Sequence, residues 1–391
     1  MGRLRATGVN LSYIIGSSLV CNLGDNFQDI TNNLISINQD NYLKRIKNIF
    51  KDKLYYPINN DYETKKDKYE QILKKIVFDA IKEAGLTKDQ QKELHIFIGS
   101  TSMDIATNEE YCNNFINNKS SIKYKEIGNG PIGTYIEDLI DSKYKATLFA
   151  TACTSATNAL SYASRLIEQK QIKRALVIGL ELFNKSTFGG FSSLMLLSKK
   201  GIYRPFDINS DGIILGEGCS AIIIDENKKN KNDFKYISSS NICDNYSETT
   251  SDPTGIPIFN TLDSTLEKAN LGLKDIDCIK AHATGSENNN LSEARAIKLL
   301  FDKYKTTTRV TSLKPLIGHT LGACGTNEIV LMLYALKKGF LPATFGFETP
   351  AEDVKFTPIL ENEKFNNKAT ILFNYVAFGG NNSSIILSNK D

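Results

Sequence analysis

The sequence has no tryptophan, only three histidines and four methionines, and nine prolines among its 391 residues. It also lacks any apolar stretch near the roughly 18 uninterrupted residues of a membrane-spanning helix, so we expect no membrane span. A formal net charge of +3 is too small to indicate nucleic-acid binding by the whole protein. What remains is an ordinary globular composition, in a chain long enough for two or three domains with a large core.

Cysteine is also limited: there are seven, an odd number, with no CxxC pair. This pattern favours reduced thiols in a cytoplasmic protein and provides no structural zinc site. Residues 207–212 match the first half of a calcium-binding loop, but position twelve is Gly218 instead of a carboxylate. The basic start and mildly apolar run ending at Cys21 imitate a secretion signal, yet Val20 stands where a small residue should precede cleavage. We therefore expect a cytoplasmic location and no metal.

Helical and strand patterns alternate along the whole chain, which indicates a layered α/β fold. Residues 69–84 have apolar side chains at helical spacing and are followed by Gly85, a residue typical of helix ends. Continuous apolar runs predict strands buried on both faces at residues 95–99, 175–179, 221–224, 369–373 and 384–387. A segment rich in lysine and asparagine at 225–233 suggests a boundary between residues 1–225 and 226–391.

Two of the three histidines lie in short motifs downstream of one particular cysteine. Residues 150–156 read ATACTSA, residues 280–286 read KAHATGS, and residues 314–323 read KPLIGHTLGA. A thiolate can attack an acyl carbonyl, and imidazoles can move protons or stabilise an oxyanion near neutral pH. Cys153, His282 and His319 therefore indicate acyl-thioester chemistry.

These motifs, in this order, resemble the β-ketoacyl-[acyl carrier protein] synthases, the Cys-His-His condensing enzymes of the thiolase superfamily. The resemblance covers nearly the whole chain and includes GSSLVCNLG at 16–24, RPFD at 204–207, DGIILGEG at 211–218 and NYVAFGGNN at 374–382. It implies a thiolase-like five-layered αβαβα fold built from two similar halves. The N-terminal half, residues 1–225, would contain the nucleophilic cysteine, and the C-terminal half, residues 226–391, both catalytic histidines.

The resemblance also implies roles for individual residues. Cys153 would lie at a tight turn before a buried helix over residues 155–169, whose N-terminus would lower the pKa of the thiol. Lys314 and Glu328 would form a buried ion pair that orders the site beside His319. The implied catalytic residues are Cys153, His282, His319, Lys314, Glu328 and Phe378.

Further residues would contact the substrate. Thr284 and Ser286 resemble the hydroxyls that bind the pantetheine arm of the carrier. Phe378 resembles the gating phenylalanine, and its backbone N–H, with that of the nucleophile, would form an oxyanion hole. Gly379 belongs to the same loop, and Val376 replaces a commonly aromatic residue near the acyl tunnel.

Three segments depart from the family pattern or are irregular. Residues 287–290 read ENNN, where relatives usually have a turn containing proline and aspartate. Residues 101–149, which in relatives help to line the acyl pocket and the dimer contact, are short and atypical, so the sequence does not predict the acyl chain length. Residues 30–67 are polar and irregular, and we interpret them as a surface insertion.

The implied reaction is decarboxylative Claisen condensation of a Cys-bound acyl chain with malonyl-carrier, in fatty-acid, polyketide or aryl-polyene biosynthesis. The atypical pocket segment favours specialised metabolism. No cofactor is expected beyond the phosphopantetheine of the substrates. The implied partners are acyl carrier protein and a second chain, in a homodimer or in a heterodimer with a ketosynthase-like partner. Basic residues just before a helix starting near Tyr69, and others further on, would dock the acidic carrier: Lys65, Lys66, Lys68, Lys199 and Lys200.

Three alternatives are weighed against this interpretation. A biosynthetic thiolase would normally show a second reactive cysteine in a C-terminal Cys-Gly motif, where this chain has AFGG at 377–380. A carrier-independent synthase with a Cys-His-Asn site is disfavoured by His319. A chain-length-factor-like partner subunit would typically lack the nucleophile, so Cys153 argues against it.

Overall fold

The computed structural model describes residues 11–390 except 46, 51–52, 59–61 and 118–129. Ten strands form one mixed sheet in the order β10-β9-β13-β14-β8-β1-β7-β6-β4-β5. The strands from the first part of the chain are β1 (Tyr13–Cys21), β4 (His95–Gly99), β5 (Thr147–Phe149), β6 (Arg174–Glu181) and β7 (Gly218–Asp225). Those from the second part are β8 (Phe234–Cys243), β9 (Cys278–Lys280), β10 (Arg309–Thr311), β13 (Thr370–Val376) and β14 (Asn381–Ser388).

The two sets of five strands repeat one topology. In each set the first strand pairs antiparallel with the last, the last pairs antiparallel with the fourth, and the remaining pairings are parallel. The sets join where Tyr13 and Ile14 of β1 pair with Lys235 and Phe234 of β8. The prediction of two similar halves is therefore confirmed. The proposed boundary after Asp225 falls between β7 and β8, and as a domain division it stays a prediction.

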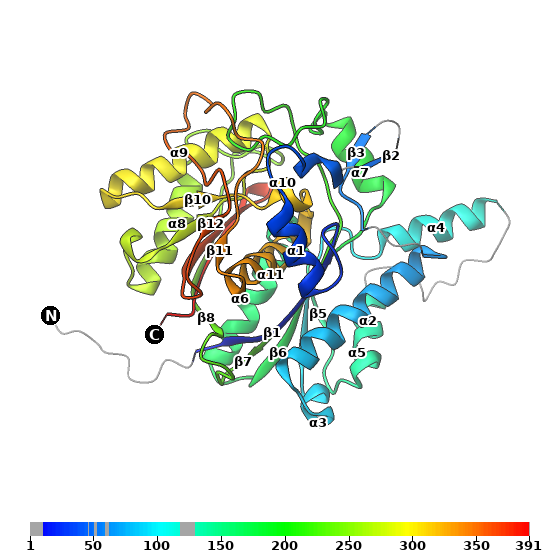
Figure 1. Ribbon diagram of the computed structural model, residues 1–391. Helices are drawn as coiled ribbons and strands as arrows, with labels where there is room; N and C mark the ends of the chain where they lie inside the picture. Colours follow the sequence, from blue (N-terminus) through cyan, green and yellow to red (C-terminus); the bar gives the residue numbers. More distant parts are fainter. Residues whose placement is uncertain (1–10, 46, 51–52, 59–61, 118–129, 391) are drawn as a thin grey trace, which may run out of the picture.

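Helices complete five layers around these strands. The two central helices are α6 (Ser155–Glu168) and α11 (Cys324–Lys337), and the outer ones are α2 (Lys65–Ala84), α8 (Ile256–Ala269) and α9 (Glu287–Tyr304). Helix α2 packs on β1 and β7, and α8 packs on β8 and β14 with α9 beside it. Helices α6 and α11 contact each other and lie between the two sets of strands (Figure 1). Separate apolar clusters fill the central layer and the two outer interfaces, so the predicted αβαβα arrangement is confirmed.

Shorter elements connect these layers. The helices are α1 (Phe27–Ser36), α3 (Lys88–Lys92), α4 (Ile105–Ile116), α5 (Gly130–Ile140), α7 (Lys185–Ser193) and α10 (Lys314–Ile317). The 3-10 turns are η1 (Tyr42–Arg45), η3 (Ala152–Thr154), η4 (Leu273–Asp275), η5 (Leu321–Ala323) and η6 (Phe378–Gly380). Two small hairpins pair β2 (Lys47–Phe50) with β3 (Lys53–Tyr55) and β11 (Phe340–Leu341) with β12 (Glu363–Lys364). None of the helices in the described part of the chain has the length and apolarity to cross a membrane.

Glycines let the two central helices approach the strands and each other. A Cβ atom added at Gly325, in the first turn of α11, would lie 2.4 Å from the Thr157 hydroxyl oxygen of α6. One added at Gly99, at the end of β4, would lie 2.3 Å from the backbone nitrogen of Ala156. Any larger residue would push these segments apart, so the two positions fix where both helices begin.

The interpretation of residues 30–67 as a surface insertion is wrong. The segment contains part of α1, the η1 turn and the β2–β3 hairpin, and Leu34, Tyr42 and Tyr55 are buried. Tyr56 has no exposed surface, and its hydroxyl donates a hydrogen bond to the carbonyl of Pro315 at 2.8 Å. The segment is part of the central core. Residues 101–149 form α4, α5 and β5, and their stretch 118–129 lies outside the described residues.

Candidate active site

Cys153 lies in the η3 turn directly before α6. The preceding Ala152 has φ 51°, a left-handed conformation that is uncommon for a residue with a side chain. The Ser155 hydroxyl holds the turn, because it donates to the carbonyl of Ala152 at 2.6 Å and accepts from the backbone N–H of Thr151 at 2.9 Å. The turn thus presents the thiol at the helix start while leaving Cys153 only 6% exposed.

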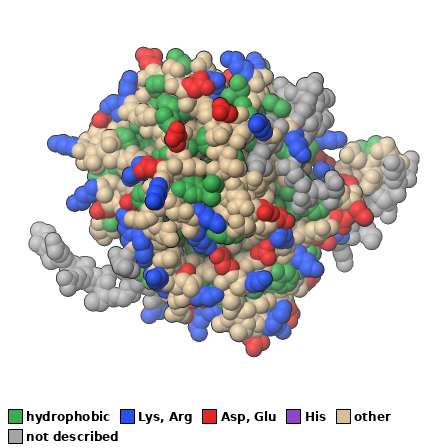
Figure 2. All heavy atoms as spheres, in the orientation of Figure 1, with side chains coloured by type: hydrophobic (Ala, Val, Ile, Leu, Met, Phe, Trp, Pro, Cys, Tyr) green, Lys and Arg blue, Asp and Glu red, His purple; other side chains and the backbone are tan. Residues whose placement is uncertain are grey.

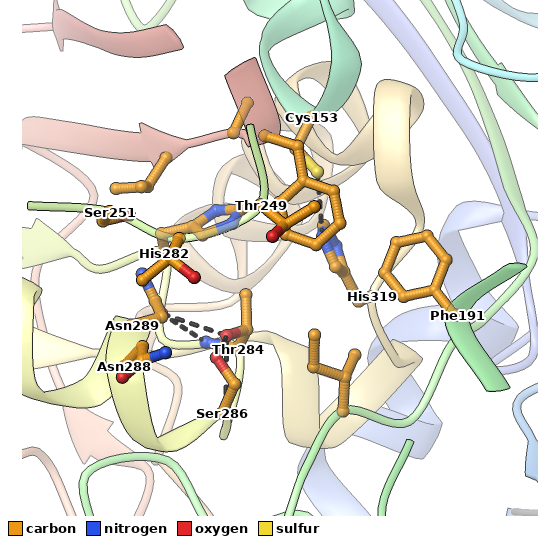
Figure 3. Close-up of a pocket in the computed structure, with 15 residues that line it drawn as sticks. Cys153, Phe191, Thr249, Ser251, His282, Thr284, Ser286, Asn288, Asn289 and His319 are labelled. Atoms are coloured by element: carbon orange, nitrogen blue, oxygen red, sulfur yellow. Dashed lines mark hydrogen bonds between the residues drawn. The ribbon is translucent and has the colours of Figure 1, made fainter. Parts of the chain in front are cut away.

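His319 contacts this thiol directly. Its Nε2 atom lies 3.1 Å from the Cys153 sulfur (Figure 3). The backbone of His319 is fixed by two hydrogen bonds, its N–H donating to Ile214 at 2.8 Å and its carbonyl accepting from Gly216 at 3.1 Å. Its ring is buried, and Nε2 faces the nucleophile, so this imidazole is placed to exchange a proton with the thiol.

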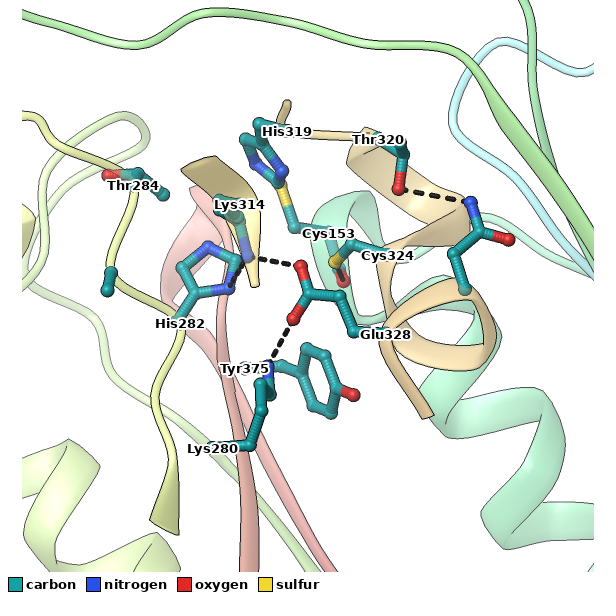
Figure 4. A network of polar contacts seen from close by, with 12 residues as sticks. Cys153, Lys280, His282, Thr284, Lys314, His319, Thr320, Cys324, Glu328 and Tyr375 are labelled. Carbon is teal, nitrogen blue, oxygen red and sulfur yellow. Dashed lines mark hydrogen bonds and ion pairs between the residues drawn. The ribbon is translucent and has the colours of Figure 1, made fainter. Parts of the chain in front are cut away.

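His282 faces the same space from the end of β9. Its backbone N–H and that of Ala283 each donate to the Glu293 carboxylate at 2.6 Å, which fixes the loop. Lys314 Nζ lies 3.3 Å from His282 Nδ1 (Figure 4). An ammonium donating to Nδ1 leaves the ring proton on Nε2, so His282 can act as a hydrogen-bond donor toward the pocket. The two rings are nearly perpendicular, at 87°, with centroids 5.2 Å apart.

The predicted ion pair of Lys314 and Glu328 is present and fully buried. Lys314 Nζ lies 2.7 Å from Glu328 Oε1. A second lysine, Lys280, contacts the other oxygen of the same carboxylate. Sequence reasoning missed Lys280, although a charged residue inside an apolar strand and two positions before His282 was a visible signal.

Burial dominates the electrostatics of the three central groups. Burial, then the Lys314 ammonium, lowers the pKa of both His282 and His319 well below the usual value, so both rings are neutral at pH 7. Burial raises the pKa of the Cys153 thiol to about 12, with Lys314 acting in the opposite direction. The expected lowering of the thiol pKa by the helix start is therefore outweighed, and the resting thiol is protonated.

The pocket above the thiol brings together most of the predicted substrate residues. It is lined by Cys153, Phe191, Ile213, Thr249, Thr250, Ser251, His282, Thr284, Ser286, Asn288, Asn289, His319, Val376, Ala377 and Phe378. The Phe378 ring stacks on Phe191, with centroids 5.5 Å apart and planes at 15°. Gly379 is not among the lining residues. It has a positive φ of 74°, and its N–H donates a hydrogen bond to the backbone carbonyl of Glu248 at 2.8 Å.

The asparagine-rich segment after Ser286 takes a specific structural role. Asn289, in the first turn of α9, accepts hydrogen bonds from the backbone N–H of Thr284 at 2.9 Å and from its hydroxyl at 3.1 Å (Figure 3). The Thr284 and Ser286 hydroxyls lie 3.0 Å apart. The unusual sequence therefore holds both predicted hydroxyls at the pocket.

Glu181 is another buried carboxylate near the central helices, and sequence reasoning missed it. At the end of β6 it accepts hydrogen bonds from the backbone N–H groups of Thr101, Ser102 and Gly322 at 3.0 to 3.1 Å. Burial raises its pKa to about 7. Because Gly322 lies in the η5 turn before α11, this side chain connects the first half of the molecule to the second.

Four of the five predicted docking lysines are exposed. Lys65 and Lys66 are exposed, but the run is the first turn of α2, which begins four residues earlier than expected. Lys68 is excluded from an exposed patch, because it pairs at 2.6 Å with the buried carboxylate of Glu217. Lys199 and Lys200 are exposed. Figure 2 shows basic and acidic side chains intermixed over the visible face.

The thiol and the two imidazoles also have the composition of a metal site. The ligand atoms of Cys153, His282 and His319 lie within 4.8 Å of one another. A cation there would meet the ammonium of Lys314, which occupies His282 Nδ1 on the opposite side of the ring. Metal-bound imidazoles normally donate that second ring position to an acceptor, so the arrangement suits proton transfer better than metal binding.

Solved structures share this fold. A chain from a complex of a type II polyketide acyl carrier protein with its ketosynthase matches with a TM-score of 0.86 and 19% identity, over 97% of this chain and 100% of that one. A β-ketoacyl synthase from Burkholderia phymatum matches with a TM-score of 0.84 and 19% identity, over 98% and 100%. A chain of the ketosynthase–chain length factor complex of Xenorhabdus doucetiae matches with a TM-score of 0.80 and 21% identity, over 99% of each chain. The molecule has the ketosynthase form of the thiolase fold.

Sequence comparison defines the family. The N-terminal domain of the β-ketoacyl synthases matches residues 27–230, and their C-terminal domain matches residues 236–348. The protein belongs to the β-ketoacyl synthase family. A putative mitochondrial 3-oxoacyl-[acyl-carrier-protein] synthase of Schizosaccharomyces pombe is 31% identical over 78% of each chain. The 3-oxoacyl-[acyl-carrier-protein] synthase 2 of Coxiella burnetii is 31% identical over 61% of this chain and 60% of that protein.

Proposed function

We propose that this protein is a 3-oxoacyl-[acyl-carrier-protein] synthase that joins an acyl chain held on Cys153 to a malonyl unit on a carrier. The observation that carries the proposal is the cluster of the Cys153 sulfur and both imidazoles within 4.8 Å, with Lys314 on the outer nitrogen of His282. The names of the relatives support it. An intact nucleophile argues against a partner subunit without activity.

Acylation comes first in the proposed reaction. The Cys153 sulfur attacks the carbonyl carbon of the acyl thioester, and the carbon–sulfur bond to the carrier's pantetheine breaks. Because the resting thiol has a pKa of about 12, it must lose its proton as the attack proceeds, and His319 Nε2 at 3.1 Å is placed to receive it. The departing pantetheine thiolate takes up that proton, so the site returns to its neutral state.

Condensation follows on the malonyl carrier. The bond to the malonyl carboxylate breaks, carbon dioxide leaves, and the electron pair moves to the thioester oxygen as an enolate. His282, with its proton on Nε2, stabilises this oxygen, and His319 does so in its Nε2–H tautomer once Cys153 is acylated. The enolate carbon then attacks the acyl carbon on Cys153, and the sulfur departs as a thiolate. The β-ketoacyl carrier is released, and the thiolate takes up a proton from solvent to regenerate the resting thiol. We propose that the backbone N–H groups of Cys153 and Phe378 stabilise the oxyanion of the acyl carbon. No step needs a metal or a dissociable cofactor.

We further propose that the carrier's arm enters by a surface groove that continues the pocket. The groove shares Ile213, Thr249, Thr250, Ser286, Asn288 and Phe378 with the pocket and extends past Leu194, Met195 and Asp211. The backbone N–H groups of Lys199 and Lys200 donate to Asp211 at 3.0 and 2.8 Å. These two lysines therefore lie next to a residue that lines the groove, and there they would attract an acidic carrier.

A paired assembly and a cytoplasmic location complete the proposal. Strand β5 is at the edge of the sheet, and an uncovered edge strand has backbone groups free to pair with another chain. Relatives have been solved as ketosynthase–chain length factor complexes. We propose that this chain pairs with a second copy or with a ketosynthase-like chain.

The test is acylation of Cys153 followed by mass spectrometry of the intact protein. Wild-type protein incubated with a panel of acyl carriers should gain the mass of one acyl group, and the preferred acyl group reports the pocket size. Cys153→Ala should gain none and should form no condensation product. Cys219→Ala, which removes a buried thiol from strand β7, should remain acylated. Condensation by Cys153→Ala at the wild-type rate would refute the proposal.

A further inference from the structure

Glu328 is shared by two buried lysines. Lys314 Nζ contacts its Oε1 at 2.7 Å, and Lys280 Nζ contacts its Oε2 (Figure 4). None of the three side chains has exposed surface. Glu328 balances one ammonium, so the second lysine is a further buried positive charge, on which the buried carboxylate of Glu293 also acts. Such a charge is costly, and stability therefore does not account for Lys280.

The contacts of Lys280 are those of a protonated amine. Besides Glu328, its Nζ donates to the backbone carbonyl of Asn374 at 3.0 Å and lies 3.7 Å from the centre of the Tyr375 ring. All three partners are electron-rich and match the three N–H bonds of an ammonium. Lys280 also precedes His282 by two positions, at the end of strand β9.

We propose that Lys280 is a positioning residue that keeps the two active-site imidazoles neutral and fixes the orientation of Lys314 toward His282. It does so in two ways. By occupying Oε2 it holds Glu328 so that Oε1 faces Lys314, whose Nζ also lies 3.3 Å from His282 Nδ1. By adding a positive charge it opposes protonation of His282 and His319, and this preserves the Nε2 proton donor of His282. The inference deepens the proposed function and rests on it.

The charges that surround His282 support this assignment. The groups facing it are Lys280 at the end of β9, Lys314 in α10, His319 after α10, Cys153 in η3, Glu328 in α11, Glu293 in α9 and Tyr375 in β13. Burial is the largest cause of the lowered His282 pKa, and Lys314, His319 and Lys280 each add to it. Glu293 has the opposite charge, but its carboxylate is engaged by backbone N–H groups. Loss of the Lys280 charge would leave Glu328 to neutralise Lys314, so the pKa of His282 would rise.

Direct titration of the imidazoles by NMR tests the inference without any substrate. The chain has three histidines, so spectra of histidine-labelled protein are simple, and His→Gln variants assign each signal. Lys280→Met keeps the length of the side chain and removes its charge. The His282 titration midpoint should rise by on the order of one pH unit, the scale of a nearby unit charge in a protein interior. His95, at the start of β4, contacts none of these residues and is the internal reference.

A second pair of variants separates charge from packing. Glu328→Gln alone raises the net charge of the cluster and should lower the His282 midpoint. The double variant Lys280→Met/Glu328→Gln restores the original net charge, so its midpoint should return to near the wild-type value. A purely structural role predicts no shift of the His282 midpoint in Lys280→Met. It also predicts that the double variant is less stable than either single variant. If Lys280→Met fails to fold, Lys280→Gln, which keeps a donor for Asn374, should show the same upward shift.

The outcomes distinguish this inference from the proposed function. An unchanged His282 midpoint in both neutral Lys280 variants would overturn the role of Lys280, whatever the protein catalyses. Where the wild-type protein decarboxylates malonyl carrier, the acid limb of its pH–rate profile should move upward with the His282 midpoint in Lys280→Met and return in the double variant. Absence of decarboxylation by the wild type, with the NMR shifts present, would instead refute the proposed reaction alone.

Discussion

The two central helices begin in the same way but present different chemistry. Each follows a three-residue 3-10 turn that opens with a residue in the left-handed region, Ala152 at φ 51° before α6 and Leu321 at φ 40° before α11. The next residue is Cys153 in the first half and Gly322 in the second. A Cβ atom at Gly322 would lie 2.3 Å from the backbone nitrogen of Thr101. The second turn therefore has no room for a nucleophile.

The second half instead provides the groups that transfer protons. His282 and His319 come from loops beside the second set of strands, and Lys314 and Glu328 support them. A single active site is thus assembled from a nucleophile of one half and imidazoles of the other, which meet because α6 and α11 are in contact. The duplicated topology brings the starts of the two central helices together. The side chains at these equivalent turns give the two halves different chemistry.

The largest expected effect comes from removing the contribution of the second half. His282→Ala and His319→Ala should each lower malonyl decarboxylation by two or more orders of magnitude, the usual scale for losing proton-transfer or oxyanion help. Acylation of Cys153 should survive in part in His282→Ala, because the imidazole hydrogen-bonded to the thiol is that of His319. Carbon dioxide release and intact mass, measured on the same samples, separate the two steps. Normal carbon dioxide release by both variants would remove the histidines from the mechanism.

One small-residue substitution in each turn tests whether the two turns are packed alike. Gly322→Ala should lower the free energy of unfolding by about 1–3 kcal/mol, the usual cost of overpacking, because its methyl group meets the backbone at Thr101. Ala152→Gly relieves a left-handed conformation but gains freedom in the unfolded chain, so its net effect should be under about 1 kcal/mol. Urea denaturation measures both. Equal destabilisation by the two substitutions would show that the turns are packed alike.

The smallest effect concerns recognition of the carrier, for which both lysine groups lie in the first half. Charge reversal at Lys199 and Lys200 should raise the KM for carrier-bound substrate several-fold at low salt, and reversal at Lys65 and Lys66 should do so less, because acidic neighbours such as Glu70 offset them.

The matched control is Lys82→Glu, an exposed lysine at the far end of α2, which should leave KM unchanged. Turnover of a small pantetheine-analogue thioester should be nearly unaffected in every charge variant, because it reaches the thiol without docking a protein. Equal losses with both substrates would indicate damage to the active site, and an unchanged KM in all variants would place docking elsewhere.

The catalytic cluster could be predicted from the sequence because each member lies in a short local motif. The family resemblance that those motifs carry also implied the helix over α6, the ion pair of Lys314 with Glu328, and the two hydroxyls at the pocket. Lys280 opens one of these motifs, but its partner could not be predicted, because the carboxylate that it contacts lies 48 positions away. The thiol pKa was misjudged for a related reason: the helix start is local, whereas the desolvation that outweighs it comes from the whole fold.

Predictions of which residues lie at the surface were less accurate than predictions of the active-site residues. Lys68 reads as one member of a basic run, but Glu217, from a distant part of the chain, draws it inward. Residues 30–67 read as an insertion because their polar composition hides tyrosines that pack on remote segments, Tyr56 on Pro315 among them. Burial of an isolated residue depends on partners that no local pattern reveals.

The strand order has a consequence for how the chain acquires its structure. Strand β1 lies beside β7, so Tyr13 cannot form its backbone pairing until Asp225 has been synthesised. Strand β8 lies beside β14, so Lys235 cannot pair until Ser388 has been synthesised. In both halves the first strand made is closed by the last. Long-range pairings of this kind slow folding and leave apolar edges uncovered in the meantime. During synthesis, β1 emerges long before its neighbour exists, so the nascent first half should depend on chaperones until β7 has been translated.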